Sequence, residues 1–260
     1  MRSRLLVLIA LLALGLIKLP LLHATEQKQH ITLSGDPWPP YIIGKLGEEA
    51  TGGVGVRLMY AIFDRLDDVE LSIPMVPWKR ALREVRHGTK DGIAILLKTP
   101  KREQYMVYSD ELFRSFNTVW YSTANFPNGF YWHQYDDFKP YTIGVVQGHS
   151  YGDELDEMID EGTLAAIKVP SVRKLFAMLK KKRIELAIAD RLVGEAFVRQ
   201  RAGVSQRLQA ADKPAAGEVY YIALSKKSEA RHLIPAINGV VAELKKEGVI
   251  DKLIGEASTD

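Results

Sequence analysis

The segment Ser34-Gly35-Asp36-Pro37-Trp38-Pro39-Pro40-Tyr41 holds side chains suited to the recognition of a small molecule. Neither a helix interior nor a central strand accommodates three prolines in eight residues, so the segment predicts a loop. Trp38 and Tyr41 place two large aromatic rings on this stiff loop. We expect the loop to form one wall of a ligand pocket, with packing in the core as the alternative for each ring.

Side chains that would indicate an enzyme or a metal centre are few. Cysteine is absent, which excludes disulfides, thiolate nucleophiles and thiolate metal sites. The six histidines show no metal-binding spacing. The sequence has no Gly-x-Ser-x-Gly elbow, phosphate-binding loop or dinucleotide fingerprint. We therefore expect a protein that is not an enzyme, with no catalytic residue, no metal and no cofactor.

The first 24 residues are typical of a secretory signal peptide. Arg2 and Arg4 precede an apolar run, Lys18 and Pro20 interrupt the run, and the small residue Ala24 follows it. The uninterrupted part is short for a membrane span, so we expect export to the periplasm with cleavage near Ala24. An uncleaved membrane anchor is the alternative.

The charge of the chain is concentrated in this leader. Three of the 35 Lys and Arg residues lie there with no acidic residue, so 32 basic and 32 acidic residues remain after it. Binding of nucleic acid needs an excess of positive charge on the folded domain, so we expect no nucleic-acid partner. The length of 260 residues allows one large domain or two smaller ones.

Apolar patterning after the leader predicts strands that alternate with helices, in two successive units. The predicted strands cover residues 31–34, 69–75, 91–97, 141–146, 166–169, 186–189 and 217–224. Helical spacing of apolar residues lies between most of them, and the last helices cover 229–254 with a break at Gly248. Thr99 suits a helix N-cap and Pro100 the first helical position. This alternation favours an α/β fold with parallel sheets.

The order of these features resembles the family 3 periplasmic solute-binding proteins, whose best-known members bind polar amino acids for ABC transporters. The matching stretches are DPWPPY at 36–41, GVGV at 53–56, PWKRAL at 77–82, TPKR at 99–102 with Tyr108-Ser109, IGVVQG at 143–148 and LKKEG at 244–248. The resemblance implies the two-lobed Venus flytrap fold of type II, in which each lobe is a mainly parallel sheet flanked by helices. The ligand lies in the cleft between the lobes.

The resemblance also implies boundaries and partners. It implies a signal peptide at 1–24, lobe 1 at 27–123 plus 219–260, and lobe 2 at 124–218. It implies a monomer that captures a small polar, amino-acid-like or carboxylate ligand. The implied partner is an ABC transporter permease or, alternatively, a membrane sensor.

Three residues match family positions that contact the ligand directly. Arg102 matches the arginine of a Thr-x-x-Arg motif, which takes the ligand α-carboxylate in a fork-shaped pair. Asp190, at the end of a predicted strand, matches the acidic residue that takes the α-ammonium group. Trp38 matches the ring that covers the ligand, with Tyr41 close by. A surface salt bridge for Arg102 and a helix cap for Asp190 are the alternatives.

Three further residues are expected at the rim of the cleft. Trp78 precedes a helix after a strand, and packing in the core of lobe 1 is an equal alternative for it. His149 and Ser150 follow a buried strand at the start of a helix, where the family presents hydroxyl and backbone N–H groups to the ligand. A helix N-cap is the alternative role for Ser150.

One stretch departs from the family pattern. Amino-acid binders usually carry a hydroxyl or a small polar residue just before the Lys98-Thr99 stretch, and this chain has Ile95-Leu96-Leu97. The ligand is therefore expected to be either a carboxylate without an ammonium group or a more apolar amino acid. Two other functions stay open: an enzyme of the cyclohexadienyl dehydratase type, which shares this fold, and a sensory ligand-binding module.

Overall fold

The computed structural model describes residues 28–199 and 207–257, so the predicted signal peptide lies outside it. The strands are β1 (Gln29–Ser34), β2 (Val69–Ser72), β3 (Gly92–Leu97), β4 (Met106–Tyr108), β5 (Phe113–Ser122), β6 (Ile143–Val146), β7 (Ala166–Val169), β8 (Leu186–Asp190) and β9 (Leu208–Ser225). The α-helices are α2 (Val54–Phe63), α3 (Trp78–His87), α4 (Pro100–Glu103), α5 (Asp153–Asp160), α6 (Val172–Lys180), α7 (Arg191–Arg199), α8 (Ile234–Lys246) and α9 (Val249–Glu256). Two short 3₁₀ helices are η1 (Tyr135–Phe138) and η2 (Glu229–Leu233).

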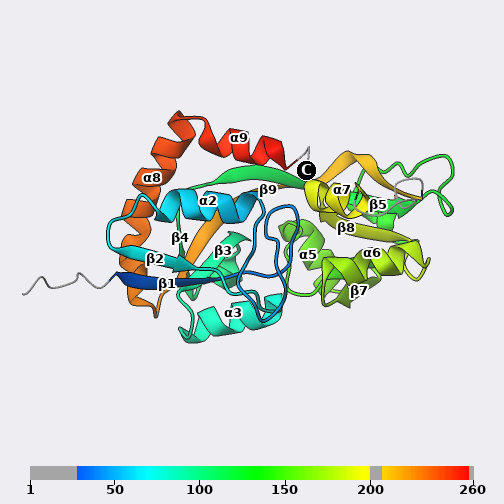
Figure 1. Ribbon diagram of the computed structural model, residues 1–260. Helices are drawn as coiled ribbons and strands as arrows, with labels where there is room; N and C mark the ends of the chain where they lie inside the picture. Colours follow the sequence, from blue (N-terminus) through cyan, green and yellow to red (C-terminus); the bar gives the residue numbers. More distant parts are fainter. Residues whose placement is uncertain (1–27, 200–206, 258–260) are drawn as a thin grey trace, which may run out of the picture.

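The strands follow the spatial order β2-β1-β3-β9-β5-β8-β6-β7, and β4 pairs with β9. Figure 1 shows two lobes, with β1 to β4 in lobe 1 and β6 to β8 in lobe 2. The long strands β5 and β9 run between the lobes. The expected fold class is thereby confirmed: each lobe is an α/β unit.

Lobe 1 is a sheet covered by helices on both faces. β1 lies between β2 and β3 and is parallel to both. α2 packs against α8 and α9 on one side of this sheet, and α3 covers the other side (Figure 1). The inward face of α2 presents Val56, Met59, Ile62 and Phe63, which are all buried in the core of lobe 1.

Lobe 2 repeats the arrangement with fewer strands. β6 is parallel to its neighbours β7 and β8. α6 buries Leu175, Phe176 and Leu179 against the sheet, as their spacing predicts. The parallel strands β6 and β8 both end at the boundary with lobe 1, so residues that follow them face the space between the lobes.

The strand expected at 217–224 is longer than predicted. β9 begins at Leu208, in a stretch that contains Asp212, Lys213 and Pro214 and has no strand-like pattern. Antiparallel pairing with β5 extends it, with Phe113 opposite Tyr220 and bulges further along the pair. Sequence periodicity could not predict this segment because its partner strand is far away in the sequence.

Local signals at helix ends were predicted correctly. Thr99 caps α4 by accepting a hydrogen bond from the Arg102 N–H group at 3.3 Å, and Pro100 is the first helical residue. Gly248 separates α8 from α9 with a φ of 72°. α7 begins at Arg191, directly after Asp190, whose carboxylate accepts the Val193 N–H group.

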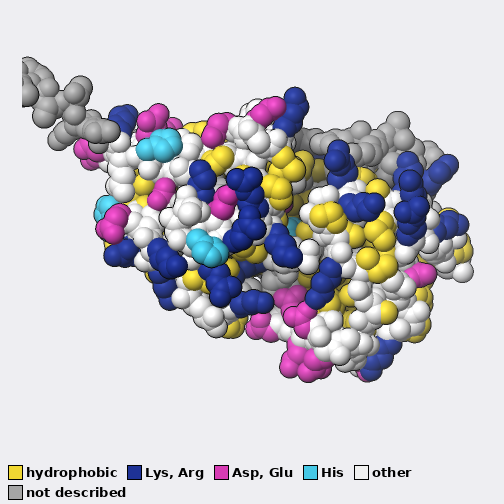
Figure 2. Space-filling view, turned by 90° about the horizontal axis from the view of Figure 1, so that it is seen from below, with side chains coloured by type: hydrophobic (Ala, Val, Ile, Leu, Met, Phe, Trp, Pro, Cys, Tyr) yellow, Lys and Arg dark blue, Asp and Glu magenta, His cyan; other side chains and the backbone are white. Residues whose placement is uncertain are grey.

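Charges on the surface are unevenly distributed. Figure 2 shows Lys and Arg side chains gathered on the face that carries α3, where Lys79, Arg80, Arg83 and Arg86 are exposed. In the part of the chain that the structure describes, no helix has the length and apolar character to cross a membrane.

Candidate functional site

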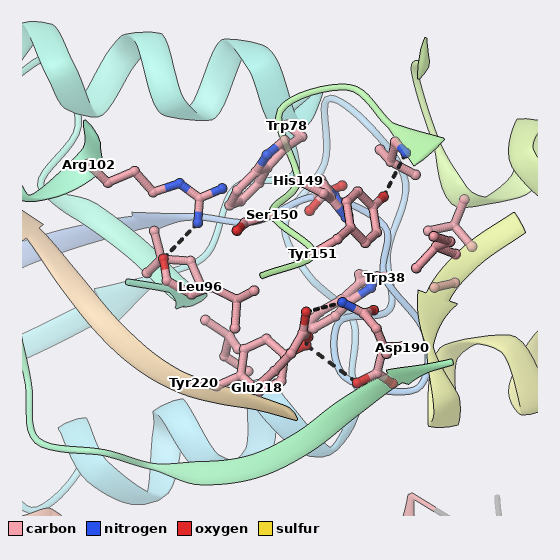
Figure 3. Close-up of a pocket in the computed structure, with 18 residues that line it drawn as sticks. Trp38, Trp78, Leu96, Arg102, His149, Ser150, Tyr151, Asp190, Glu218 and Tyr220 are labelled. Atoms are coloured by element: carbon pink, nitrogen blue, oxygen red, sulfur yellow. Dashed lines mark hydrogen bonds between the residues drawn. The ribbon is translucent and has the colours of Figure 1, made fainter. Parts of the chain in front are cut away.

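A cavity lies between the two lobes, where β3, β5, β8 and β9 meet the loops that follow β1 and β6. Figure 3 shows Arg102 and Asp190 on opposite sides of this cavity, with Glu218 and Tyr220 between them. The cavity volume is about 50 Å³. A single water molecule needs roughly 10–15 Å³ on the same scale, so the cavity has room for more than one water molecule. The cavity brings together six of the seven predicted site residues: Trp38, Trp78, Arg102, His149, Ser150 and Asp190.

The proline-rich loop is fixed onto the start of α2. Backbone carbonyls of Pro40 and Tyr41 accept the N–H groups of Val54 at 3.0 Å and Gly55 at 2.9 Å. A Cβ atom on Gly53 would lie 2.3 Å from the Tyr41 oxygen, and its φ is 104°, so this close approach requires glycine. The loop is therefore preorganised, and its Trp38 ring is only 9% exposed.

Tyr41 does not line the cavity. Its ring lies beneath Trp38 at 4.5 Å between centroids and stacks on Phe113 at 5.5 Å, and its side chain is fully buried. Its hydroxyl group lies 3.3 Å from both Ser115 Oγ and Asp190 Oδ2. Tyr41 thus supports Trp38 and Asp190 from behind and corresponds to the packing alternative.

Arg102 projects from α4 into the cavity and is 6% exposed. Its Nη1 donates to the Leu97 carbonyl at 2.7 Å and its Nη2 to the Gly148 carbonyl at 2.8 Å. Among the described residues it forms no ion pair with a carboxylate. Desolvation lowers the pKa of Arg102, although nearby tyrosines and acidic residues oppose this shift. The alternative of a surface salt bridge does not apply to this buried side chain.

Trp78 forms a contact between the lobes. Its Nε1 donates to the Gly148 carbonyl at 2.9 Å, and its ring meets His149 edge-on at 5.5 Å. The Arg102 guanidinium lies 5.3 Å from the centre of the same ring. Desolvation and the charge of Arg102 lower the pKa of His149 to about 3, so the imidazole is neutral at pH 7.

Ser150 lines the cavity, although its hydroxyl group is already engaged. Ser150 Oγ donates to Asp156 Oδ2 at 2.6 Å, and the Tyr151 N–H group donates to Asp156 Oδ1 at 2.9 Å. The N-cap position of α5 is Gly152, so the proposed N-cap role of Ser150 is wrong. With its proton directed to Asp156, the Ser150 oxygen is available to the cavity as an acceptor.

Asp190 lies at the end of β8 and is 4% exposed. Ser115 Oγ donates to its Oδ2 at 2.6 Å, and the Val193 N–H group donates to its Oδ1 at 3.1 Å. Asp190 therefore caps the helix, as the alternative role states, and it also lines the cavity. Desolvation raises the pKa of Asp190 to about 6, although these hydrogen bonds oppose the shift.

Sequence analysis did not select Glu218, which lies on β9 and is 6% exposed. Asn117 Nδ2 donates to its Oε1, and the Tyr220 hydroxyl donates to its Oε2. Desolvation raises the pKa of Glu218 to about 8, and the negative charge of Asp190 adds to this effect. One signal could have identified it, namely a charged residue in an otherwise apolar predicted strand.

The remaining walls are mostly apolar. Ile95, Leu96 and Leu97 of β3 form one side, and Val146, Val172 and Ile188 belong to lobe 2. Within residues 28–199 and 207–257, no group of three His, Asp or Glu side chains could hold a metal ion. The cavity is thus an apolar chamber with a few buried charged and polar groups, which is the usual composition of a binding site for a small molecule.

The two-lobed fold and a cavity between the lobes define the class of periplasmic binding proteins. A family model for bacterial extracellular solute-binding proteins, family 3, matches residues 31–256, and the chain belongs to this family. A search of curated protein sequences gives no match.

Solved structures agree with this class. An ancestral arginine-binding protein bound to arginine superimposes with a TM-score of 0.74 at 19% identity, covering 88% of this chain and 98% of that one. The P235GK mutant of ArgBP from T. maritima gives a TM-score of 0.73 at 25% identity, covering 90% and 96%. A histidine kinase sensor domain with similarity to periplasmic binding proteins gives 0.74 at 14% identity, covering 89% and 96%.

Proposed function

We propose that the protein captures a small amino-acid-like or carboxylate ligand between its lobes and delivers it to an ABC transporter. The observation that carries this proposal is the buried guanidinium of Arg102, which lines the cavity and has no carboxylate partner among the described residues. A buried charge is costly unless it is paired. A ligand carboxylate would supply the missing negative charge.

The hydrogen-bonding capacity of Arg102 supports this assignment. A guanidinium carries five N–H donors, and two of them are used by the carbonyls of Leu97 and Gly148. A ligand carboxylate would accept hydrogen bonds from donors that remain. An ammonium group at the other end of the ligand would pair with Asp190.

This geometry couples binding to closure of the lobes. Arg102 belongs to lobe 1, and Asp190 ends a strand of lobe 2. A ligand that bridges them is fully satisfied only when the lobes are closed, so binding shifts the population toward the closed form. A transporter could then distinguish the loaded protein from the empty one by its shape.

The known relatives support a carrier more than an enzyme. The family is described as extracellular solute-binding proteins, and the structure with 25% identity is ArgBP from T. maritima. We propose a monomer whose partner is a transporter permease, with a membrane sensor as the alternative partner. Turnover of prephenate or arogenate would instead indicate the dehydratase alternative.

The extracellular family supports the expected export of the chain. We propose a periplasmic protein whose leader, residues 1–24, is removed near Ala24. The mass of the mature protein checks the cleavage site, and recovery of the full-length chain from the inner membrane would contradict it.

The clamp is tested by calorimetry on purified variants, with ligands chosen by a thermal-shift screen of amino acids, organic acids and polyamines. Arg102→Ala should weaken binding at least tenfold, because an unpaired buried ligand charge costs about 2–5 kcal/mol and a factor of ten is about 1.4 kcal/mol. Arg114→Ala is the matched control, since Arg114 is exposed and pairs with Glu111.

Asp190→Asn separates the two ligand classes. The amide oxygen can still cap α7, so the variant removes the charge and keeps the cap. A zwitterionic ligand should lose at least about tenfold in affinity, whereas a simple carboxylate should lose little. Near-native affinity in Arg102→Ala would refute the clamp for either ligand class.

A further inference from the structure

The exposed side of α3 is strongly basic in a protein that is otherwise acidic. Residues 77–90 hold five Lys and Arg side chains and one acidic side chain, Glu84, which leaves a charge of +4. The remainder of the chain after the leader has 27 basic and 31 acidic residues, because the totals there are 32 and 32. Figure 2 shows that the cations of α3 gather on one face of the molecule. The positive charge of this face is therefore a local feature and not a consequence of composition.

Most of these cations have no partner within the protein. Arg80 pairs with Glu84 at 2.6 Å, whereas Lys79, Arg83 and Arg86 form no ion pair among the described residues. Lys79 and Arg83 lie four residues apart on the helix, where like charges are slightly destabilising. The stability of the fold therefore does not explain this pattern, and an anionic partner outside the protein would.

An apolar loop lies next to the start of α3. Its side chains Ile43 and Leu46 are 43% and 53% exposed, and Lys45 lies between them in the sequence. The Met75 N–H group donates to the Glu48 carbonyl at 2.8 Å, which holds the loop close to the helix. Lys45 and Leu46 also line one cavity with the first residue of α3. The face thus carries two exposed aliphatic side chains beside its cations.

We propose that this face, formed by the exposed side of α3 and by residues 43–49, binds the surface of a bilayer that contains anionic phospholipids. The cations would lie at the phosphate groups, and Ile43 and Leu46 would enter the boundary between headgroups and acyl chains. Residues 43–49 contain Lys45, Glu48 and Glu49, so the whole face keeps a charge of +3. The inference does not depend on the ligand, so its failure would leave the clamp at Arg102 standing.

A lipid surface fits this face better than a folded protein does. Protein interfaces have a well-packed apolar core that is depleted in charged residues. Every exposed residue of α3 is a Lys, Arg or His, so the helix offers no such core. Long basic side chains can reach lipid phosphates without a fixed geometry, since their stems are flexible. Binding of this kind would keep an exported protein near a transporter embedded in the same membrane.

The test is co-flotation of the purified protein with lipid vesicles. Phosphatidylcholine alone is compared with an equal mixture of phosphatidylcholine and phosphatidylglycerol, at ionic strengths of about 0.01 M and about 0.15 M. The charge variant combines Lys79→Gln, Arg83→Gln and Arg86→Gln. The matched control removes three exposed cations from α8 and α9, on the other side of the lobe 1 sheet, through Lys245→Gln, Lys246→Gln and Lys252→Gln.

At low ionic strength the wild type and the control should bind the mixed vesicles at least about tenfold more tightly than phosphatidylcholine, and the charge variant should lose this preference. At about 0.15 M the preference should fall, because the screening length shortens from about 30 Å to about 8 Å. Leu46→Ser should weaken binding roughly fivefold through the loss of a half-exposed aliphatic side chain. Tyr60→Ser is its control, since Tyr60 is exposed on α2 on the far side of the sheet.

All proteins share one N-terminus, so differences among them report this face, and thermal unfolding of each variant checks that the fold is retained. Equal binding by the charge variant and the wild type would overturn the proposal. Binding that is insensitive to salt and to phosphatidylglycerol would also overturn it, because the cations would then play no part. Absence of binding to the mixed vesicles at about 0.01 M would exclude the bilayer and leave an acidic protein as the partner of this face.

Discussion

Loss of water, more than any neighbouring charge, sets the protonation of the carboxyl groups around the cavity. For Glu218 the hydrogen bond from Tyr220 and the charge of Arg102 favour ionisation, yet desolvation is the larger effect. For Asp190 the hydrogen bonds from Ser115 and the α7 backbone also oppose desolvation without cancelling it. Such raised pKa values are typical of functional sites, because a structural carboxylate is normally paired.

The raised pKa of Glu218 predicts how stability depends on pH without ligand. Between pH 4.5 and pH 8 the unfolded chain has an ionised Glu218 and the native state keeps the proton. The native state then binds more protons, so the free energy of unfolding falls as the pH rises through this window. The slope attributable to one group is at most about 1.4 kcal/mol per pH unit.

Urea unfolding of the empty protein at several pH values between 7 and 8 measures this slope, because Asp190 and Asp36, with pKa values of about 6 and about 7, contribute mainly below that range. Glu218→Gln should flatten the slope, and the control Glu229→Gln should keep it, because Glu229 is exposed on η2. Equal slopes for the wild type and Glu218→Gln would show that Glu218 is ionised in the native state.

At the scale of elements, the sequence predicts those site residues whose positions depend on residues close to them in the chain. The Thr99-Pro100 cap places Arg102 in the first turn of α4, and an apolar strand that ends in an acidic residue identifies Asp190. These residues depend on neighbours in the sequence. Trp38 is fixed by a loop that can also be predicted from nearby residues, namely its prolines and the following Gly53.

The sequence marks Glu218 as a charged residue in an apolar strand, but its place in the cavity wall could not be predicted from its neighbours in the sequence. It depends on β9, whose register against β5 places Glu218 opposite Ser115 and near Asn117. The first half of β9 contains Asp212, Lys213 and Pro214, which do not favour a strand, and pairing with β5 alone makes it one. The same long-range pairing determines which face of β9 meets the cavity.

The packing of α7 against β5 predicts a destabilising glycine substitution. A Cβ atom on Gly194 would lie 2.1 Å from the indole ring of Trp120, which is buried on β5. Gly194→Ala gains roughly 1 kcal/mol in helix propensity but overpacks this contact, so we expect a net loss of about 1–3 kcal/mol in stability.

Gly239→Ala is the matched control for this substitution. Gly239 lies within α8, and nothing lies within 4 Å of the position of its Cβ. Alanine there should stabilise the protein by about 0.5–1 kcal/mol. Thermal unfolding of both variants provides the comparison. An unchanged or raised midpoint for Gly194→Ala would mean that α7 can move away from β5 at no cost.

At the scale of the whole molecule, one carbonyl group joins the lobes on the side of Arg102. The oxygen of Gly148, in the loop after β6, accepts hydrogen bonds from Trp78 Nε1 at 2.9 Å and Arg102 Nη2 at 2.8 Å. Both donors belong to lobe 1, so the opening of the lobes that we propose would break these bonds. Arg102, which we assign to the ligand carboxylate, would thus also stabilise the closed form.

Trp78→Phe tests this role in closure. Phenylalanine keeps an aromatic ring beside His149 but removes the N–H donor, so the closed form should lose about 1 kcal/mol and ligand affinity should fall roughly fivefold. Small-angle scattering should give a larger radius of gyration for the ligand-free variant than for the wild type, and saturating ligand should restore compactness.

Trp132→Phe is the matched control, because Trp132 Nε1 is buried within lobe 2 and has no hydrogen-bond partner there to lose. Wild-type affinity and an unchanged radius in Trp78→Phe would show that the Gly148 contact does not contribute to closure.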